Sequence, residues 1–159
     1  MSDIVKEIII GAGIKGLKFG MDRDAVKNSI GSPDEIEQYT DEETDELLNE
    51  AWHYDDIELS LSFDKEEEWK LCTISVSDPD FTLNGKKLIG ANEADLLEFI
   101  DAEGLGSHDS EEWSTEDDET QKVLSIDEKS LNFWFTEGAV TEIQWGPLYT
   151  EDDQTIWPS

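Results

Sequence analysis

The chain has 159 residues and carries 41 acidic against 11 basic side chains, a net charge of −30 at neutral pH. This charge disfavours binding to nucleic acid backbones and to anionic membranes, and it favours a cationic partner such as a basic protein or a divalent metal. Apolar residues make up 36% of the chain, with six Trp and six Phe, so the composition predicts a folded protein rather than a disordered acidic chain.

The N-terminal segment shows no targeting signal. Residues 1–7 lack the basic and long apolar regions of a secretory signal, and no apolar run in the chain approaches the length of a membrane span. Because Cys72 is the one cysteine, no internal disulfide can form. We therefore predict a cytoplasmic protein.

Residues 7–20, EIIIGAGIKGLKFG, contain the pattern G-x-G-x-x-G at Gly11, Gly13 and Gly16. Such a pattern seats a dinucleotide pyrophosphate only where a helix begins within the glycine run. Here the first helix signal comes later, at Asp22, which is an N-cap type of residue followed by RDAVKNSI. We therefore predict turns around a strand at these glycines, and no nucleotide cofactor.

The chain resembles itself at a spacing of about 70 residues. LKFGMDRDAVKNSIG matches KLIGANEADLLEFID at a shift of 70, and WHYDDIELSLSF matches LSIDEKSLNFWF at a shift of 72. A capped helix, an acidic connection and strands recur in the same order, which indicates a repeated unit. We predict a single domain over 1–159, with repeat 1 at about 17–77, repeat 2 at about 87–146 and a C-terminal extension at 147–159.

The predicted strands alternate between apolar and polar side chains. The apolar positions are Ile57, Leu59, Leu61 and Phe63 in the first unit and Leu131, Phe133 and Phe135 in the second. Such alternation is typical of an antiparallel sheet with one packed face and one solvated face. Between the units, FTLNGKKLI predicts a hairpin that turns at Asn84-Gly85. The predicted fold class is therefore α+β, with two tandem αβββ-type repeats that form one antiparallel sheet with the helices on one face.

Short motifs mark the first unit. They are Gly20-Met21 before a capped helix, the helix ending Ile30-Gly31-Ser32-Pro33, an aromatic strand with Trp52 and Tyr54, the strand from Leu59 to Phe63, and an isolated Ile74. These motifs resemble a repeat of the β-lactamase inhibitor protein and of the small lipoprotein in the bacterial outer-membrane barrel-assembly machine. The second unit departs from the pattern, because Gly104-Leu105-Gly106 follows its helix.

The resemblance covers most of the chain at the level of architecture. The lipoprotein family also carries a signal peptide and a lipidated cysteine, and this chain has neither. In size and acidity the chain is also similar to the small immunity proteins that are encoded beside bacterial toxins. The resemblance thus implies either an inhibitor or a scaffold that binds another protein.

The sequence offers no constellation for catalysis. Cys72 is expected to share the buried strand face of Ile74, His53 to form a surface pair with Glu58, and His108 to lie in a solvated acidic loop. The carboxylate clusters do not follow the spacing of a calcium loop, so weak calcium binding stays open while a dedicated metal site is not predicted. We predict no catalytic, cofactor-binding or metal-ligating residues.

Two features indicate a protein partner. Acidic residues gather in the two helix–strand connections, 34–50 and 101–119, where they either keep the protein soluble or attract a basic partner. Trp134 lies between two core residues of its strand, so it should face solvent unless the C-terminal extension covers it. The predicted partner-binding residues are Asn132, Trp134, Glu142 and Gln144 on the open sheet face, and Asp117, Asp118 and Glu119 in the second acidic connection.

The sequence therefore predicts a non-enzymatic protein-binding module, an immunity or inhibitor protein that neutralises a basic bacterial toxin by occlusion. The acidic loops would steer the toxin to the surface, and aromatic residues on the open sheet would anchor it. The alternatives are a scaffold or assembly factor with the same fold, and an enzyme or weak calcium-binding protein.

Overall fold

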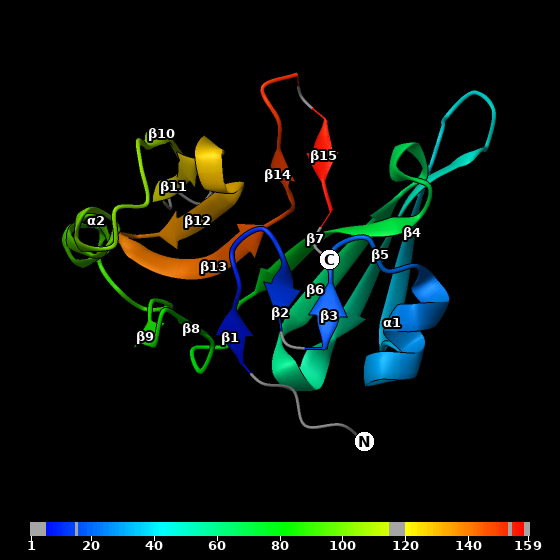
Figure 1. The fold of residues 1–159 in the computed structure, drawn as a ribbon, viewed down its shortest axis with the longest axis horizontal. Helices are drawn as coiled ribbons and strands as arrows, with labels where there is room; N and C mark the ends of the chain where they lie inside the picture. The colour runs from blue at the N-terminus through cyan, green and yellow to red at the C-terminus, as the bar shows by residue number, and fades with distance from the viewer. Residues whose placement is uncertain (1–5, 15, 115–119, 153, 158–159) are drawn as a thin grey trace.

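The computed structural model describes residues 6–14, 16–114, 120–152 and 154–157 (Figure 1). Eight strands form one antiparallel sheet in the order β10-β11-β12-β13-β7-β6-β5-β4. They are β4 (Glu35–Thr40), β5 (Leu47–Tyr54), β6 (Leu59–Asp64), β7 (Lys70–Val76), β10 (Asp109–Ser114), β11 (Thr120–Ile126), β12 (Leu131–Thr136) and β13 (Ala139–Trp145). The two halves of this main sheet meet where β13 pairs with β7.

Shorter elements surround the main sheet. The described residues contain two α-helices, α1 (Arg23–Ile30) and α2 (Glu93–Ala102), and three 3-10 helices, η1 (Asp55–Ile57), η2 (Lys65–Glu67) and η3 (Asp127–Lys129). The short strands are β1 (Glu7–Ile8), β2 (Gly13–Ile14), β3 (Leu17–Lys18), β8 (Thr82–Leu83), β9 (Lys86–Lys87), β14 (Leu148–Tyr149) and β15 (Thr155–Ile156). Figure 1 shows α1 and α2 at opposite ends of the molecule, with β1, β2 and β3 between them.

Side-chain caps fix where both α-helices begin. The Asp22 carboxylate accepts a hydrogen bond from the Ala25 amide at 2.8 Å, and Asn92 accepts one from the Asp95 amide at 2.8 Å. Each cap satisfies an amide that has no partner within its helix. At the other end of α1, the carbonyl of Gly31 accepts a hydrogen bond from the Tyr54 hydroxyl at 2.8 Å, which holds the helix against β5.

The core lies on one face of the main sheet. Leu59, Leu61 and Phe63 of β6 are buried and alternate with half-buried polar residues, as the sequence predicts, and β12 shows the same alternation. The helices and the N-terminal segment pack on this face, and the Trp145 indole N–H donates to the carbonyl of Gly13 at 3.2 Å. On the other face of the described sheet Ala51 is buried but lies outside the main hydrophobic cluster, and most of the residues are polar, so we call it the open face.

The glycine run forms turns rather than a phosphate cradle. Gly13 lies in the β2–β3 hairpin with φ 126°, and a Cβ at this position would lie 2.2 Å from the carbonyl oxygen of Leu17. Only glycine fits such a close approach of two backbones. In the described residues the first helix begins at Arg23, so the helix that a dinucleotide fingerprint requires does not follow Gly16. The predicted hairpin at Asn84-Gly85 is confirmed by the pairing of β8 with β9.

The predicted fold class, α+β with two αβββ-type repeats, is wrong. The described chain is mostly β, with two short α-helices beside an eight-stranded sheet. The error lies in the two connections that the charge pattern predicts as acidic loops, because they contain β4 and β10, the outermost strands of the sheet. An edge strand can meet solvent on both faces, so it does not need the alternation by which strands are recognised in a sequence.

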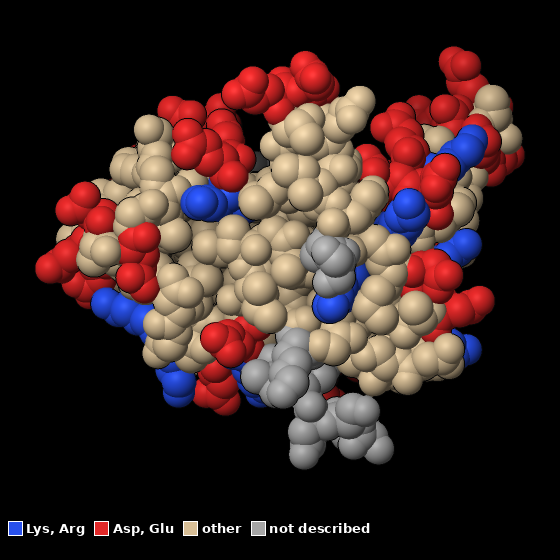
Figure 2. Space-filling view, viewed as in Figure 1, with Lys and Arg blue, Asp and Glu red and all other residues tan. Residues whose placement is uncertain are grey.

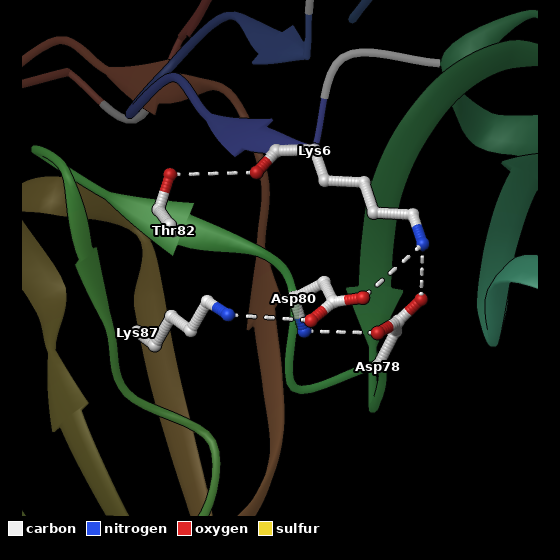
Figure 3. A network of polar contacts seen from close by, with 5 residues as sticks. All are labelled: Lys6, Asp78, Asp80, Thr82 and Lys87. Atoms are coloured by element: carbon white, nitrogen blue, oxygen red, sulfur yellow. Dashed lines mark hydrogen bonds and ion pairs between the residues drawn. The ribbon is translucent and has the colours of Figure 1, made fainter. Parts of the chain in front are cut away.

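A network of ion pairs anchors the N-terminal strand to the segment after β7 (Figure 3). Lys6 Nζ lies 2.7 Å from Asp78 Oδ2, and Lys87 Nζ lies 3.4 Å from Asp80 Oδ1. The Thr82 amide donates to the Lys6 carbonyl at 2.9 Å, next to the parallel pairing of β1 with β8. Burial by itself would raise the pKa of Asp78, but hydrogen bonds from the Lys6 ammonium and the Asp80 amide outweigh it and lower that pKa.

Candidate functional site

The open face carries side chains in rows that run across neighbouring strands. The register of the main sheet places one row through Glu35, His53, Ser60, Ser75, Gln144, Asn132, Ser125 and Asp109. A second row runs through Glu142, Trp134, Val123 and Glu111. Side chains directly opposite each other on adjacent strands are close enough to interact, so each row is a continuous strip of surface. Most of this surface is polar, and carboxylates lie at both ends of the first row.

The four residues predicted on the open face lie side by side. Asn132 pairs with Gln144, and Trp134 pairs with Glu142, across β12 and β13. The Trp134 indole N–H donates to Gln144 Oε1 at 3.2 Å, which fixes the orientation of the ring. Burial raises the pKa of Glu142, so this carboxylate is partly desolvated before any partner arrives. The three predicted carboxylates Asp117, Asp118 and Glu119 lie outside the described residues.

Trp113 is a neighbour of Trp134 that the sequence analysis missed. Its ring meets the Trp134 ring edge to face, with centroids 6.0 Å apart and planes at 82°. Trp113 comes from the edge strand β10 and remains 40% exposed, whereas Trp134 is half-buried. The sequence does contain a signal for this strand, because every second residue, Asp109, Glu111 and Trp113, falls on one face of β10. The high charge of the segment predicts a loop instead. The two rings, which we call the tryptophan pair, form the aromatic part of the open face.

The C-terminal extension packs elsewhere in its described part. Pro147 forms a bridge with Gly11, and the Trp157 ring lies against Gly20. Lys70 Nζ lies 5.2 Å from the centroid of the Trp157 ring. The tail therefore runs along the N-terminal segment and β7, and Trp113 is the residue that packs on Trp134.

At the other end of the open face, His53 connects three strands. Its Nδ1 lies 2.7 Å from Ser60 Oγ, and its Nε2 lies 2.8 Å from Glu37 Oε1. The expected pairing with Glu58 is wrong, because η1 follows β5 and the register sets His53 opposite Ser60. Glu37 also accepts a hydrogen bond from the Tyr39 hydroxyl at 2.8 Å, and this bond is the largest cause of the lowered pKa of Glu37.

Three shallow depressions adjoin these rows. One of about 420 Å³ lies beside His53 and Glu142, and one of about 590 Å³ lies beside Asn132, Gln144 and Cys72. A third, of about 250 Å³, lies against β10 and is lined by Asp109, Ser110, Glu111, Val123, Ser125 and Asp127. Each has carboxylates in its lining, so each is suited to a cationic group rather than to an anion.

The sequence predicts that Cys72 shares the buried strand face of Ile74, and this prediction is wrong. The register shifts between Ser62 and Phe63, so Leu71 takes the core position and Cys72 is half-buried, with its Sγ 3.4 Å from the Ser62 carbonyl. Burial, together with the nearby Asp64 carboxylate, raises the pKa of the Cys72 thiol to about 11. This thiol is therefore protonated at neutral pH and is a poor nucleophile.

The arrangement suits cation binding more than chemistry. Figure 2 shows the side of the molecule on which β1, β2 and β3 lie, opposite the open face, and there too Asp and Glu gather along the margins. Among the described residues, no group of three or more His, Cys, Asp or Glu side chains is arranged to hold a metal ion. The open face combines an aromatic pair, amide side chains and carboxylates, which a positively charged partner could contact.

Comparison with known proteins does not show a family for this chain. No protein-family model matches it, and no curated protein does. A crystal structure of an extracellular protein containing an SCP domain from Bacillus anthracis is similar with a TM-score of 0.46 and 13% identity, over 89% of this chain and 49% of that one. A likeness of this degree carries no argument about fold or function. Within the described residues, no helix is long and apolar enough to cross a membrane.

Proposed function

We propose that this protein is a non-enzymatic binding protein that occludes a basic protein, as a cytoplasmic immunity protein does with a toxin. The observation that supports this proposal is the tryptophan pair, set on an open sheet face among amide side chains and carboxylates. A large half-exposed aromatic group within a polar surface is typical of a binding hot spot. The net charge of −30 adds attraction for a cationic partner.

The binding mechanism has two parts. Carboxylates on the open face and in the acidic connections attract the partner over a distance and raise the association rate, with a range of roughly 8 Å at physiological ionic strength. The tryptophan pair is then buried against the partner and slows dissociation. Glu142, which is already partly desolvated, lies beside Trp134 and is placed to pair with a Lys or Arg side chain of the partner.

The test is co-expression with the product of the adjacent gene. We expect that product to contain a basic toxin domain, to arrest growth when expressed alone, and to be neutralised by this chain. In the purified complex, the association rate should fall steeply as salt is added. Failure to restore growth, together with the absence of a complex at low salt, would contradict the proposal.

A matched pair of variants tests the surface itself. Trp134→Ala should abolish protection, whereas Ile156→Ala, an exposed apolar residue of β15, should preserve it. If the Trp134→Ala variant folds and protects fully, the partner binds elsewhere on the molecule.

A further inference from the structure

We infer that the free edge of β10 receives an extended basic segment of the partner, which adds to the main sheet as a further strand. The inference rests on the proposed function and specifies the chemistry of the partner segment, in which Lys or Arg recurs at every second position. It goes beyond the open face because it assigns a role to the backbone of Asp109–Ser114.

The position of β10 leaves one of its edges available. It is the last strand of the main sheet, and in the described chain its only strand partner is β11, along all six residues. As far as the described residues go, the amide and carbonyl groups on its other side are therefore free to pair with an added strand, which is how many proteins bind extended peptides.

Carboxylates line this edge of the sheet. Asp109 and Glu111 point to the open face, and with Asp127 they line the depression of about 250 Å³. Within the described residues none of these three carboxylates forms an ion pair. The basic residue of β11, Lys122, is paired with Glu93 of α2 instead. The carboxylates of the edge are thus available to cationic side chains from outside.

The side chains of β10 alternate in a way that suits an added strand. Asp109, Glu111 and Trp113 occupy the same face of β10, spaced as successive side chains on one face of a strand. An added strand would set its own alternate side chains beside them. Two of these should be Lys or Arg opposite the carboxylates, and a third would lie over the exposed Trp113 ring, where either a cation or an apolar group is favourable.

The same charges argue against a second copy of this chain as the occupant. Within the described chain, the two edges of the main sheet that a copy could offer are β10 and β4, and β4 carries Glu35 and Glu37. Either edge would bring carboxylates opposite carboxylates, which is destabilising. The β4 edge is a weaker candidate for the partner, because Glu37 is already held by Tyr39 and His53.

A peptide titration tests the inference. The probe is a synthetic six-residue peptide, equal in length to β10, that alternates lysine with threonine or valine. Two versions carry backbone N-methyl groups, one on the lysines and the other on the residues between them. Because the amides of every second residue point to the edge in an added strand, one version should bind at least about tenfold more weakly and the other should bind normally.

Amide hydrogen exchange and a charge control complete the experiment. Binding of the unmodified peptide should slow exchange at alternate amides of Asp109–Ser114 by more than about tenfold. The double variant Asp109→Asn/Glu111→Gln should bind the peptide more weakly than Asp101→Asn/Glu103→Gln, which removes the same charge from the exposed end of α2.

The outcomes of these experiments separate strand addition at β10 from the proposed function. Equal binding of the two methylated peptides, or no protection of β10 amides, would overturn strand addition while leaving the proposed function intact. Absence of binding by the unmodified peptide also overturns it. Failure of the proposed function would appear separately, as a full toxin that this chain neither binds nor neutralises. A dimer of this chain that protects the same amides without peptide would assign the edge to a second copy.

Discussion

The rings of Trp113 and Trp134 meet edge to face across the outer strands of the sheet, at 6.0 Å between centroids. One ring comes from the edge strand and the other from β12, so the contact spans β11. It places the edge strand and the open face in one surface. A partner that contacts Trp134 from the open face would therefore lie beside the outer backbone edge of β10, so the open face and this edge are neighbouring parts of one surface.

Removing the Trp134 ring should act on dissociation. Truncation of a buried aromatic anchor costs about 2 kcal/mol or more of binding free energy, and most of that loss appears as faster release. We expect Trp134→Ala to raise the dissociation rate of the complex about thirtyfold, with little change in the salt dependence of association. Surface plasmon resonance at several salt concentrations measures both rates. An unchanged affinity in a folded variant would move the contact away from the open face.

The tryptophan pair should also stabilise the free protein. Edge-to-face aromatic pairs contribute roughly 0.5–1.5 kcal/mol beyond the burial of their area. We expect a double-mutant cycle of Trp113→Leu and Trp134→Leu to give a coupling free energy of about 1 kcal/mol in urea unfolding. The pair Trp113→Leu and Tyr149→Leu, which lie on different strands of different sheets, is the control and should be additive. If the free-energy changes of Trp113→Leu and Trp134→Leu are additive, the contact between the two rings does not stabilise the edge strand β10.

The acidic cluster after β10 should act on association. Asp117, Asp118 and Glu119 lie outside the described residues, so the prediction rests on their charge alone. Neutralising all three as Asn, Asn and Gln should slow association with a basic partner and flatten its salt dependence, while the dissociation rate stays close to that of the parent. Stopped-flow measurements at low and physiological salt give the comparison. A variant that associates at the parental rate at low salt would remove this cluster from the steering mechanism.

The sequence predicts the parts of this molecule in which one face is buried. Leu61 and Phe133 mark strands whose apolar residues must alternate, and the same alternation correctly places Trp134 on the open face. It misses β4 and β10, because the segments EIEQYT and DSEEW are exposed and neither presents a continuous row of apolar residues on one face. Without these strands, the contact of His53 with Glu37 and the contact of Trp134 with Trp113 cannot be inferred. Both depend on which strand lies beside which, and that is a long-range property of the sheet.

The Cys72 thiol should react slowly. Its pKa, raised by burial to about 11, leaves a far smaller thiolate fraction at pH 8 than a free cysteine has, with its usual pKa of about 8.5. We expect iodoacetamide to modify Cys72 in the native protein more than about 100-fold more slowly than in urea at the same pH. Mass spectrometry of quenched samples measures both rates. Equal rates would show that the thiol is ionised and accessible in the folded protein.

The Lys6–Asp78 ion pair should make stability depend on acid. The folded protein lowers the pKa of Asp78 below its unfolded value of about 3.9, because the hydrogen bonds from Lys6 and the Asp80 amide outweigh the effect of burial. The stabilisation is therefore complete above the unfolded pKa and is lost as the pH falls through the folded one. The pKa of Lys6 shifts in the opposite direction, because its hydrogen bond to Asp78 raises it. The contribution of Lys6 to folding stability is therefore lost only in strong alkali.

The variant Asp78→Asn isolates this contribution. Its partner Lys6 is less suitable for substitution, because Lys6 also anchors the N-terminal strand. At pH 7 the variant should be less stable than the parent by about 1 kcal/mol, in the range of hydrogen bonds to charged groups at partly exposed sites. The difference should shrink as the pH falls below the unfolded pKa of about 3.9, because the unfolded parent then binds a proton at Asp78 that the folded parent does not yet bind. Asp80→Asn is the control: Asp80 lies 4.0 Å from Lys6 and its side chain is 62% exposed, so its removal should change stability little. Urea unfolding between pH 3 and 7 tests this, and a stability difference that stays constant over that range would show that the Asp78 charge does not hold the N-terminal strand.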